Sequence, residues 1–204
     1  YWSINNNKTT SSVDRITGNL NLSYDLTPWV SVNYRLGLDA YTDRRKQIFA
    51  IGAARLPTGG IFEDIYYRSE INSDLIFRFK KDKLFSENIN FTGLLGYNVN
   101  QRKFQNVSAY GGGLTLPNYY NINNATTYTS ANGATGESNS LRRLIGYYGQ
   151  VSLDYKKYLF LELTGRLDQS STLPVANNSF FYYSGSLGLS LTDAFNIKSD
   201  VLSF

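Results

Sequence analysis

The sequence predicts an all-β chain: an antiparallel segment of a transmembrane β-barrel, with about seven strands that belong to a larger barrel. Three observations predict this fold class. Apolar and polar residues alternate with a period of two over seven segments. The connections between these segments alternate between short and long. The chain is 15% aromatic, yet its mean hydropathy is −0.32, which is typical of strands that have one apolar and one polar face.

The first two segments show the alternation most clearly. In 15–26, every even position from Ile16 onward is apolar or glycine, whereas every odd position is polar. Pro28 has no N–H to donate to a ladder, so 25–28 is predicted to be a turn. The alternation then resumes in 30–40, again with apolar residues at even positions.

The remaining five segments have the same two-faced pattern. They are 67–79, 88–101, 143–155, 158–168 and 181–192. A soluble β-sandwich is the alternative, because its strands also bury one face. Strands of about 10–13 residues match a tilted membrane crossing better than they match a soluble sheet. Aromatic residues gather near the strand ends, as they do at membrane interfaces: Tyr24, Trp29, Tyr41, Tyr97, Tyr155, Tyr158 and Phe181.

The connections predict which end of each strand faces outward. Short ones are expected near 25–28, 80–87 and 154–157, with a fourth over 192–199, and long ones over 42–64, 102–140 and 169–178. Alternate connections of an antiparallel meander share one end, as do the short periplasmic turns and long extracellular loops of outer-membrane barrels. An open sheet edge leaves backbone groups unpaired in lipid. The sheet is therefore expected to continue at both ends, and 202–204 reads as the approach to a further strand.

Composition argues against an enzyme, a metal protein and a nucleic-acid binder. The chain has no Cys and no His, which removes disulfides, thiol nucleophiles and the commonest general base and metal ligand. The net charge of +4 is modest, and the basic residues fall in short clusters. No cofactor is expected. The longest apolar run, 48–54, is too short for a membrane-spanning helix. A chain that starts at Tyr1 and lacks Met is expected to be an interior fragment or a mature segment rather than a complete gene product.

One strand carries charged residues in a regular pattern. Glu162, Arg166 and Asp168 lie on the polar face of the segment 158–168, at two- and four-residue spacing. Such neighbours can form a ladder of ion pairs inside a barrel, and contact with a ligand or a plug is the alternative. Catalysis would need two carboxylates in distinct environments, and Arg166 between them favours pairing instead.

The long connections hold the candidate contact residues. Tyr119, Tyr120 and Tyr128 lie in 102–140 among many Asn, Thr and Gly residues, where their rings could stack on a sugar or a peptide side chain. An ordinary polar outer loop is the alternative. The apolar run 48–54 predicts either a partner surface or a loop that packs on itself.

Basic residues are expected at the outer rim of the barrel. Arg44, Arg45, Lys46, Arg142 and Arg143 could contact lipopolysaccharide phosphates, and simple solvation is the alternative.

Four short stretches resemble SusC/RagA-type TonB-linked transporters of Bacteroidetes. They are 18–24 leading into Thr27-Pro28-Trp29, 94–97, 166–171 and 181–187. The resemblance covers essentially the whole chain in the order of the family. The family usually has Gly where Gln169 stands and Pro where Tyr183 stands, so the local geometry at those junctions is open.

The resemblance implies a barrel of about 22 strands with an N-terminal plug, located in the bacterial outer membrane and capped by a SusD-like surface lipoprotein. It implies import of oligosaccharides or peptides with energy from TonB. Residues 1–204 would be part of the barrel domain; the plug, the TonB-contacting region and the other strands lie outside this sequence. A passive porin or structural barrel is the alternative function, and a barrel enzyme or adhesin is a third. An upstream plug would distinguish the transporter from a porin.

Overall fold

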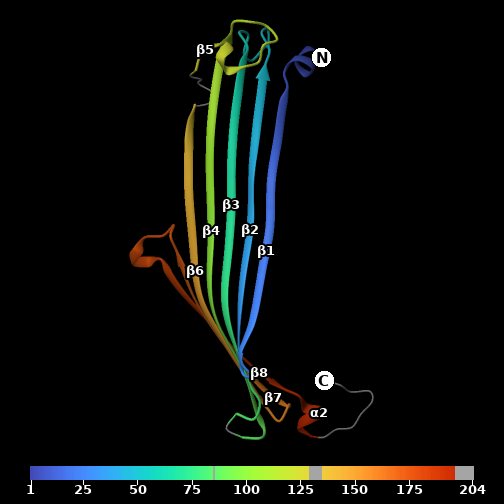
Figure 1. Ribbon diagram of the computed structural model, residues 1–204, viewed down its shortest axis with the longest axis vertical. Coiled ribbons are helices and arrows are strands. Elements are labelled where there is room, and N and C mark those ends of the chain that lie inside the picture. Colours follow the sequence, from blue (N-terminus) through green and yellow to red (C-terminus); the bar gives the residue numbers. More distant parts are fainter. Residues whose placement is uncertain (85, 129–134, 196–204) are drawn as a thin grey trace. The chain divides into compact units, whose positions relative to one another are not determined.

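The computed structural model describes residues 1–84, 86–128 and 135–195. Seven strands lie side by side in one sheet, in the order β1-β2-β3-β4-β6-β7-β8, and the short β5 pairs with β4 (Figure 1). The strands are β1 (Thr9–Thr27), β2 (Val30–Phe49), β3 (Gly60–Lys81), β4 (Ile89–Leu114), β5 (Ala125–Thr127), β6 (Gly136–Tyr155), β7 (Leu159–Ser170) and β8 (Ser179–Leu189). Four short helical turns are α1 (Trp2–Asn6), η1 (Ile122–Asn124), η2 (Val175–Asn177) and α2 (Leu191–Ala194).

The pairing is antiparallel throughout, so the predicted fold class is confirmed. The β6–β7 register runs from Tyr155 opposite Leu159 to Leu144 opposite Ser170. All seven predicted segments are strands, and each pairs with the next long strand along the chain.

The strands extend further than the alternation predicted. β2 continues to Phe49 and β3 begins at Gly60, so the connection predicted over 42–64 is only 50–59. Similarly, the connection predicted over 102–140 is 115–135, because β4 continues to Leu114 and β6 begins at Gly136. Polar and charged residues occupy both faces of these extensions, which hides the period of two. Ladder hydrogen bonds join backbone groups, so the pairing does not need an apolar face.

The last predicted segment is too long at its C-terminal end. β8 ends at Leu189 rather than at 192, and the chain turns into α2, where Ser190 Oγ donates a hydrogen bond to Asp193 Oδ2 (2.6 Å). The turn predicted over 192–199 is described only to residue 195, and the strand approach predicted at 202–204 lies outside the described residues.

The chain divides into two compact units; β1, β2, β3, β4 and β6 contribute residues to both, whereas β7 and β8 belong to unit 2. Unit 1 consists of Tyr1–Gly18, Leu38–Glu70 and Arg102–Leu141. Its core is a small cluster of Ile61, Leu114 and Ala125, with Tyr120 and Ile122 packed against it. Unit 2 consists of Asn19–Gly37, Ile71–Gln101 and Arg142–Phe204, and it contains the tight turns.

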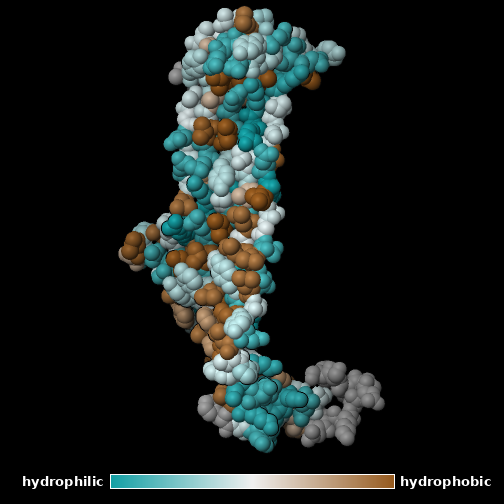
Figure 2. Space-filling view, in the orientation of Figure 1, coloured by the Kyte–Doolittle hydropathy of each residue, from teal (hydrophilic) through white to brown (hydrophobic). Residues whose placement is uncertain are grey.

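Unit 2 exposes one apolar face of its sheet. Leucines at alternating positions, among them Leu22, Leu163 and Leu187, are 50–72% exposed, and Figure 2 shows apolar side chains on the surface of the strands. Exposed apolar area on this scale marks a surface that meets an apolar partner or lipid. Within the described residues, no helix is both long enough and apolar enough to span a membrane.

Candidate functional site

Polar side chains cross-link three strands on the other face of unit 2. The Asp74 carboxylate on β3 receives Arg35 Nη2 from β2 at 3.3 Å and Asn98 Nδ2 from β4 at 2.7 Å. Asn98 Nδ2 also donates to Asn72 Oδ1 (3.1 Å). Asp74 is buried although it lies on a sheet face, because these neighbours cover it. This face is therefore a connected hydrogen-bonded wall.

The structure brings together two of the three residues predicted to form an ion-pair ladder. Arg166 Nη2 lies 2.8 Å from Asp168 Oδ1. Glu162 lies four residues away on the same strand and instead accepts hydrogen bonds from Gln150 Nε2 (2.9 Å) and Ser152 Oγ (3.3 Å) on β6. The polar face thus contains one ion pair on β7 and a separate Glu162 contact with β6.

A glycine makes room for an aromatic ring beside this ion pair. Arg166 lies over the Tyr148 ring, with its Cζ 5.4 Å from the ring centroid. The ring in turn covers Gly96 on β4, where an added Cβ would be only 2.1 Å from Tyr148 Cζ. Only glycine permits this approach, so Gly96, Tyr148 and Arg166 form one packed stack.

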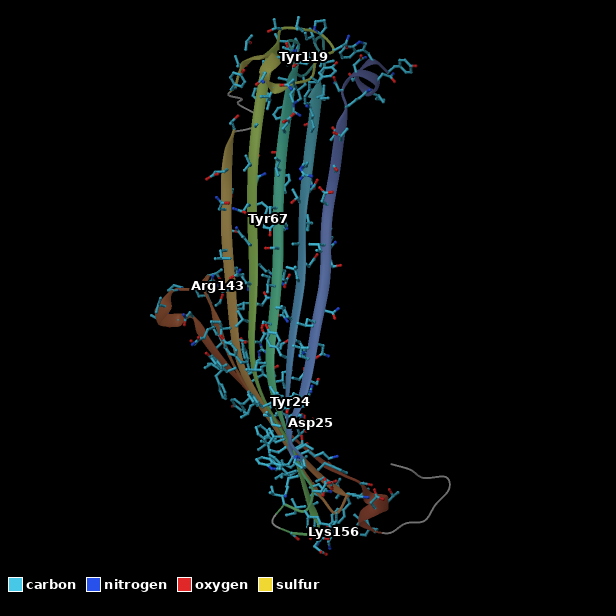
Figure 3. All side chains as sticks on the ribbon, viewed as in Figure 1. Tyr24, Asp25, Tyr67, Tyr119, Arg143 and Lys156 are labelled. Atoms are coloured by element: carbon cyan, nitrogen blue, oxygen red, sulfur yellow. The ribbon has the colours of Figure 1, made fainter. Side chains whose placement is uncertain are left out.

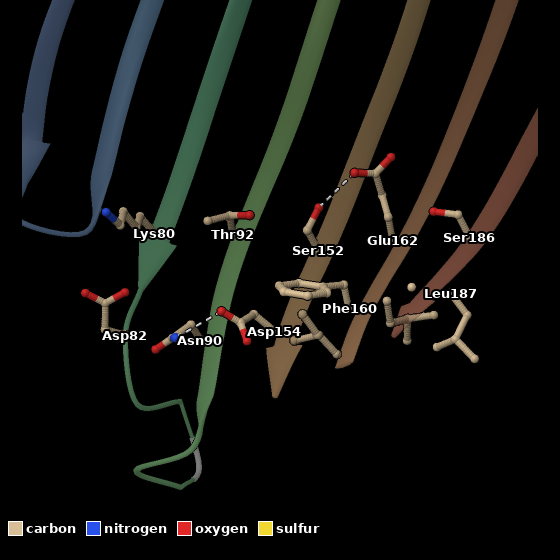
Figure 4. Close-up of a pocket in the computed structure, with 13 residues that line it drawn as sticks. Lys80, Asp82, Asn90, Thr92, Ser152, Asp154, Phe160, Glu162, Ser186 and Leu187 are labelled. Carbon is tan, nitrogen blue, oxygen red and sulfur yellow. Dashed lines mark hydrogen bonds between the residues drawn. The ribbon is translucent and has the colours of Figure 1, made fainter. Parts of the chain in front are cut away.

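A hollow of about 580 Å³ lies in unit 2 where five strands contribute side chains (Figure 4). Its polar lining includes Lys80, Thr92 and Ser186, and Asn90 Nδ2 donates to Asp154 Oδ2 at 3.4 Å. The lining supplies amide, hydroxyl and charged groups around Phe160. These groups are suited to hydrogen bonding with polar atoms of another chain segment.

In unit 1, two connections lie against the end of β4, and we call them the loop platform: residues 50–59 and 115–128. Backbone hydrogen bonds join it to the end of β4, with Gly113 N donating to Gly59 O (3.2 Å) and Leu114 N to Thr58 O (2.9 Å). The buried Asn124 donates to the carbonyls of Leu116 (2.8 Å) and Tyr119 (2.7 Å). The loop platform therefore holds a defined backbone conformation.

The three candidate contact tyrosines differ in their environment. Tyr119 is 51% exposed and Tyr128 is 49% exposed, and Figure 3 places Tyr119 on the connection after β4. Tyr120 packs against the small core cluster of unit 1. Tyr119 and Tyr128 thus present ring surface outward, whereas Tyr120 mainly supports the loop.

The apolar run 48–54, most of which belongs to the loop platform, packs within unit 1. Phe49, Ala50 and Ala53 are buried, and only Ile51 among the large apolar residues of this run is strongly exposed. Of the two alternatives for this run, the structure therefore favours internal packing.

The polar face of unit 1 carries a stack of arginines and aromatic rings that the sequence analysis missed. Arg45 Cζ lies 4.9 Å from the Tyr66 ring centroid, the Tyr66 and Phe104 rings are stacked at 6.3 Å, and Arg68 Cζ lies 4.9 Å from the Phe104 centroid. Two of these residues, Arg45 and Phe104, are in segments predicted to be loops. The alternation itself was a usable signal. Each of these residues is even-numbered or odd-numbered in the same way as the polar positions of its own strand, so it is expected on the polar face.

A carboxylate fixes one end of this stack. Asp43 Oδ2 accepts from Arg45 Nη2 at 2.7 Å, and Asp43 Oδ1 accepts from Ser11 Oγ at 2.7 Å. The hydrogen bond from Arg45, followed by the one from Ser11, lowers the pKa of the Asp43 carboxyl below its ordinary value. Arg45 is therefore a positioned cation with its charge already partnered.

The predicted basic rim is partly neutralised. Arg44 pairs with Asp14, and Lys46 Nζ lies 2.7 Å from Glu63 Oε1. Arg143, labelled in Figure 3, donates from Nε to Gln101 Oε1 at 2.7 Å.

The chain is similar to solved structures described as the RagAB peptide transporter. One gives a TM-score of 0.87 at 15% identity and covers 98% of this chain but 22% of that chain. The RagAB peptide importer in its closed-closed state gives 0.85 at 15% identity, covering 96% and 22%; the open-open state gives 0.85 at 15%, covering 98% and 22%. The sequence matches no protein-family model, and a search of curated proteins returned no match.

This likeness establishes the fold: the chain is an all-β sheet that matches a fragment of a transporter β-barrel. The chain spans about a fifth of the length of the solved chains that it matches.

Proposed function

We propose that this chain forms part of the wall and outer loops of a TonB-dependent nutrient importer of the SusC/RagA type in a bacterial outer membrane. The observation that carries this proposal is the match of 98% of the chain to a peptide transporter, at a TM-score of 0.87. In this proposal residues 1–204 belong to the barrel domain, and other parts of the complete protein supply the plug and the contact with TonB.

The two faces of the sheet support a barrel wall. The exposed leucines of unit 2 would face outer-membrane lipid, with lipopolysaccharide around the rim, and the cross-linked polar face would line the wet lumen. The hydrogen-bonded wall suits a scaffold rather than a reaction centre, which supports a transporter over an enzyme.

The loop platform would make the outer contacts. Rigid scaffolds commonly present their binding residues on loops, and the platform holds Tyr119 and Tyr128 half-exposed on a fixed backbone. We propose that these two rings contact the cargo, an oligosaccharide or a peptide, or the SusD-like lipoprotein that caps the barrel. The peptide-transporting neighbours favour a peptide cargo.

The test is energy-dependent uptake by the complete protein in its own cell envelope. Replacing Tyr119 and Tyr128 together by Ala is expected to lower uptake or lipoprotein association severalfold, because both stacking surfaces are lost. Barrel abundance should be unchanged. Tyr120→Phe is the matched control, since it keeps the ring in the core cluster and should transport normally.

Two outcomes would reject parts of this proposal. Uptake that persists when the proton-motive force is collapsed would identify a passive porin. Normal uptake and normal lipoprotein association in the Tyr119/Tyr128 double variant would show that the platform does not make the functional contacts.

A further inference from the structure

We propose that Arg68, held against Phe104 on the polar face of unit 1, binds carboxylate groups of the imported cargo. The inference rests on the proposed function and adds to it a substrate class: cargo that carries carboxylates, such as acidic peptides. The residues that carry the inference all belong to unit 1.

Arg68 is the end of an ordered stack. The stack runs from Arg45 through Tyr66 and Phe104 to Arg68, with both arginine carbons 4.9 Å from the centroid of the ring beneath them. A guanidinium stacked on a ring keeps its edge N–H donors available, because the ring contacts only its flat face. The stack thus reduces the side-chain freedom of Arg68 without using its hydrogen-bond donors.

The other strand arginines on this face have carboxylate partners. Arg15 pairs with Asp39 at 2.7 Å, Arg45 with Asp43 at 2.7 Å and Arg102 with Glu70 at 3.0 Å. For Arg68, in contrast, no carboxylate lies within ion-pair distance among the described residues. The nearby Asp64, on the same strand and of the same parity, accepts a hydrogen bond from Ser108 Oγ. Arg68 is therefore exposed, positioned and not neutralised.

The chemistry of this group fits a carboxylate. The planar fork of arginine donors matches the two oxygens of a carboxylate, and the resulting bidentate hydrogen bonds are stronger than neutral ones. Phe104 and Tyr66 add apolar surface beside the charge, which suits the methylene groups of a glutamate side chain. Because Arg68 is already ordered, binding loses less side-chain entropy than it would for a free arginine.

The experiment measures binding of two probes, fluorescently labelled triglutamate and triglutamine, to the purified complete protein. The wild type should bind triglutamate more tightly. Arg68→Gln should weaken triglutamate binding about tenfold, as expected for loss of a charge-assisted hydrogen bond, and should leave triglutamine binding unchanged. Arg44→Gln is the matched control. Arg44 already pairs with Asp14, and as the neighbour of Arg45 on β2 it lies on the opposite face of the sheet.

Phe104→Leu keeps the positive charge but removes the stack, so it should cause a smaller loss of triglutamate binding. This variant also tests the proposal if Arg68→Gln does not fold. Equal affinity of the wild type for the two probes, or unchanged triglutamate binding in both Arg68→Gln and Phe104→Leu, would overturn the proposal. Charge-selective binding without energy-dependent uptake would instead reject the importer function and leave the role of Arg68 as an anion-binding residue intact.

Discussion

Units 1 and 2 share β1, β2, β3, β4 and β6 but differ in what the alternating positions of these strands carry. In unit 2, the even positions of β1 expose apolar residues such as Leu20 and Leu22. In unit 1, the even position Asp14 of β1 pairs with Arg44 of β2, and Lys46 pairs with Glu63 of β3. Side chains alternate along a strand with a period of two, so these charged residues occupy the same alternating positions as the apolar residues further along each strand. The chemistry of that face changes along the strand while the backbone pairing continues.

The polar faces differ as well. In unit 2, amides and carboxylates such as Asn98 and Asp74 bond to one another across strands. In unit 1, arginines stack on aromatic rings. A face whose polar groups bond to one another is suited to holding a wall together, whereas a stacked arginine without a carboxylate partner, such as Arg68, is suited to contacting something that passes.

The largest difference in effect is expected when an arginine is placed on the same face of the sheet in unit 2 and in unit 1. Leu163 in unit 2 and Leu141 in unit 1 are both 50% exposed. Leu163→Arg should cost about 2–4 kcal/mol if that face meets the bilayer midplane, whereas Leu141→Arg, next to Arg142 and Arg143, should be nearly neutral. The fraction of folded barrel in isolated outer membranes measures both. Equal losses in the two variants would show that the apolar face of unit 2 does not face lipid.

A smaller effect is expected from filling the space beneath Tyr148. Gly96→Val should displace the Tyr148 ring and its contact with Arg166, at a cost of about 1–3 kcal/mol, as for other overpacked sites. Gly18→Val is the matched control, because nothing lies within 4 Å of a Cβ added there. The thermal unfolding midpoint of the purified protein distinguishes them. A Gly96→Val variant as stable as Gly18→Val would mean that Tyr148 moves aside freely.

The smallest effect concerns the charged end of the stack in unit 1. Because Arg45 and Ser11 lower the pKa of Asp43, its charge contributes stability that is fully present above the unfolded pKa of about 3.9. That contribution is lost as the pH falls through the lower folded pKa. Asp43→Asn should therefore lower the unfolding midpoint at neutral pH, and the difference from wild type should shrink only below about pH 4. A difference that stays constant down to the most acidic pH would exclude the charge of Asp43 as its cause.

Much of the fold could be predicted from the sequence, because one face of each strand in unit 2 is apolar and the other polar. The extensions of β2, β3 and β4 could not be predicted by that signal, since residues such as Arg44 and Arg45 put charge on both faces. The contacts of the candidate site were harder still. Glu162 and Arg166 share a face and a favourable spacing, yet Glu162 bonds across to β6. Which neighbour a side chain meets depends on the register between strands, and one strand alone does not encode it.

The turn between β6 and β7 bears on the order in which the sheet assembles. Lys156 and Lys157 both have positive φ, at 51° and 64°, and Lys157 N donates to Asp154 Oδ1 at 2.7 Å. This closes a hairpin over three connecting residues, 156–158, whereas the β4–β6 connection has to close 115–135. Loop-closure entropy rises with the length of the closed segment, and contacts close in sequence form fastest. The β6–β7 hairpin, like the β1–β2 hairpin with its connecting residues 28–29, is therefore expected to form before the β4–β6 pairing, and β8 can then pair with it from one side.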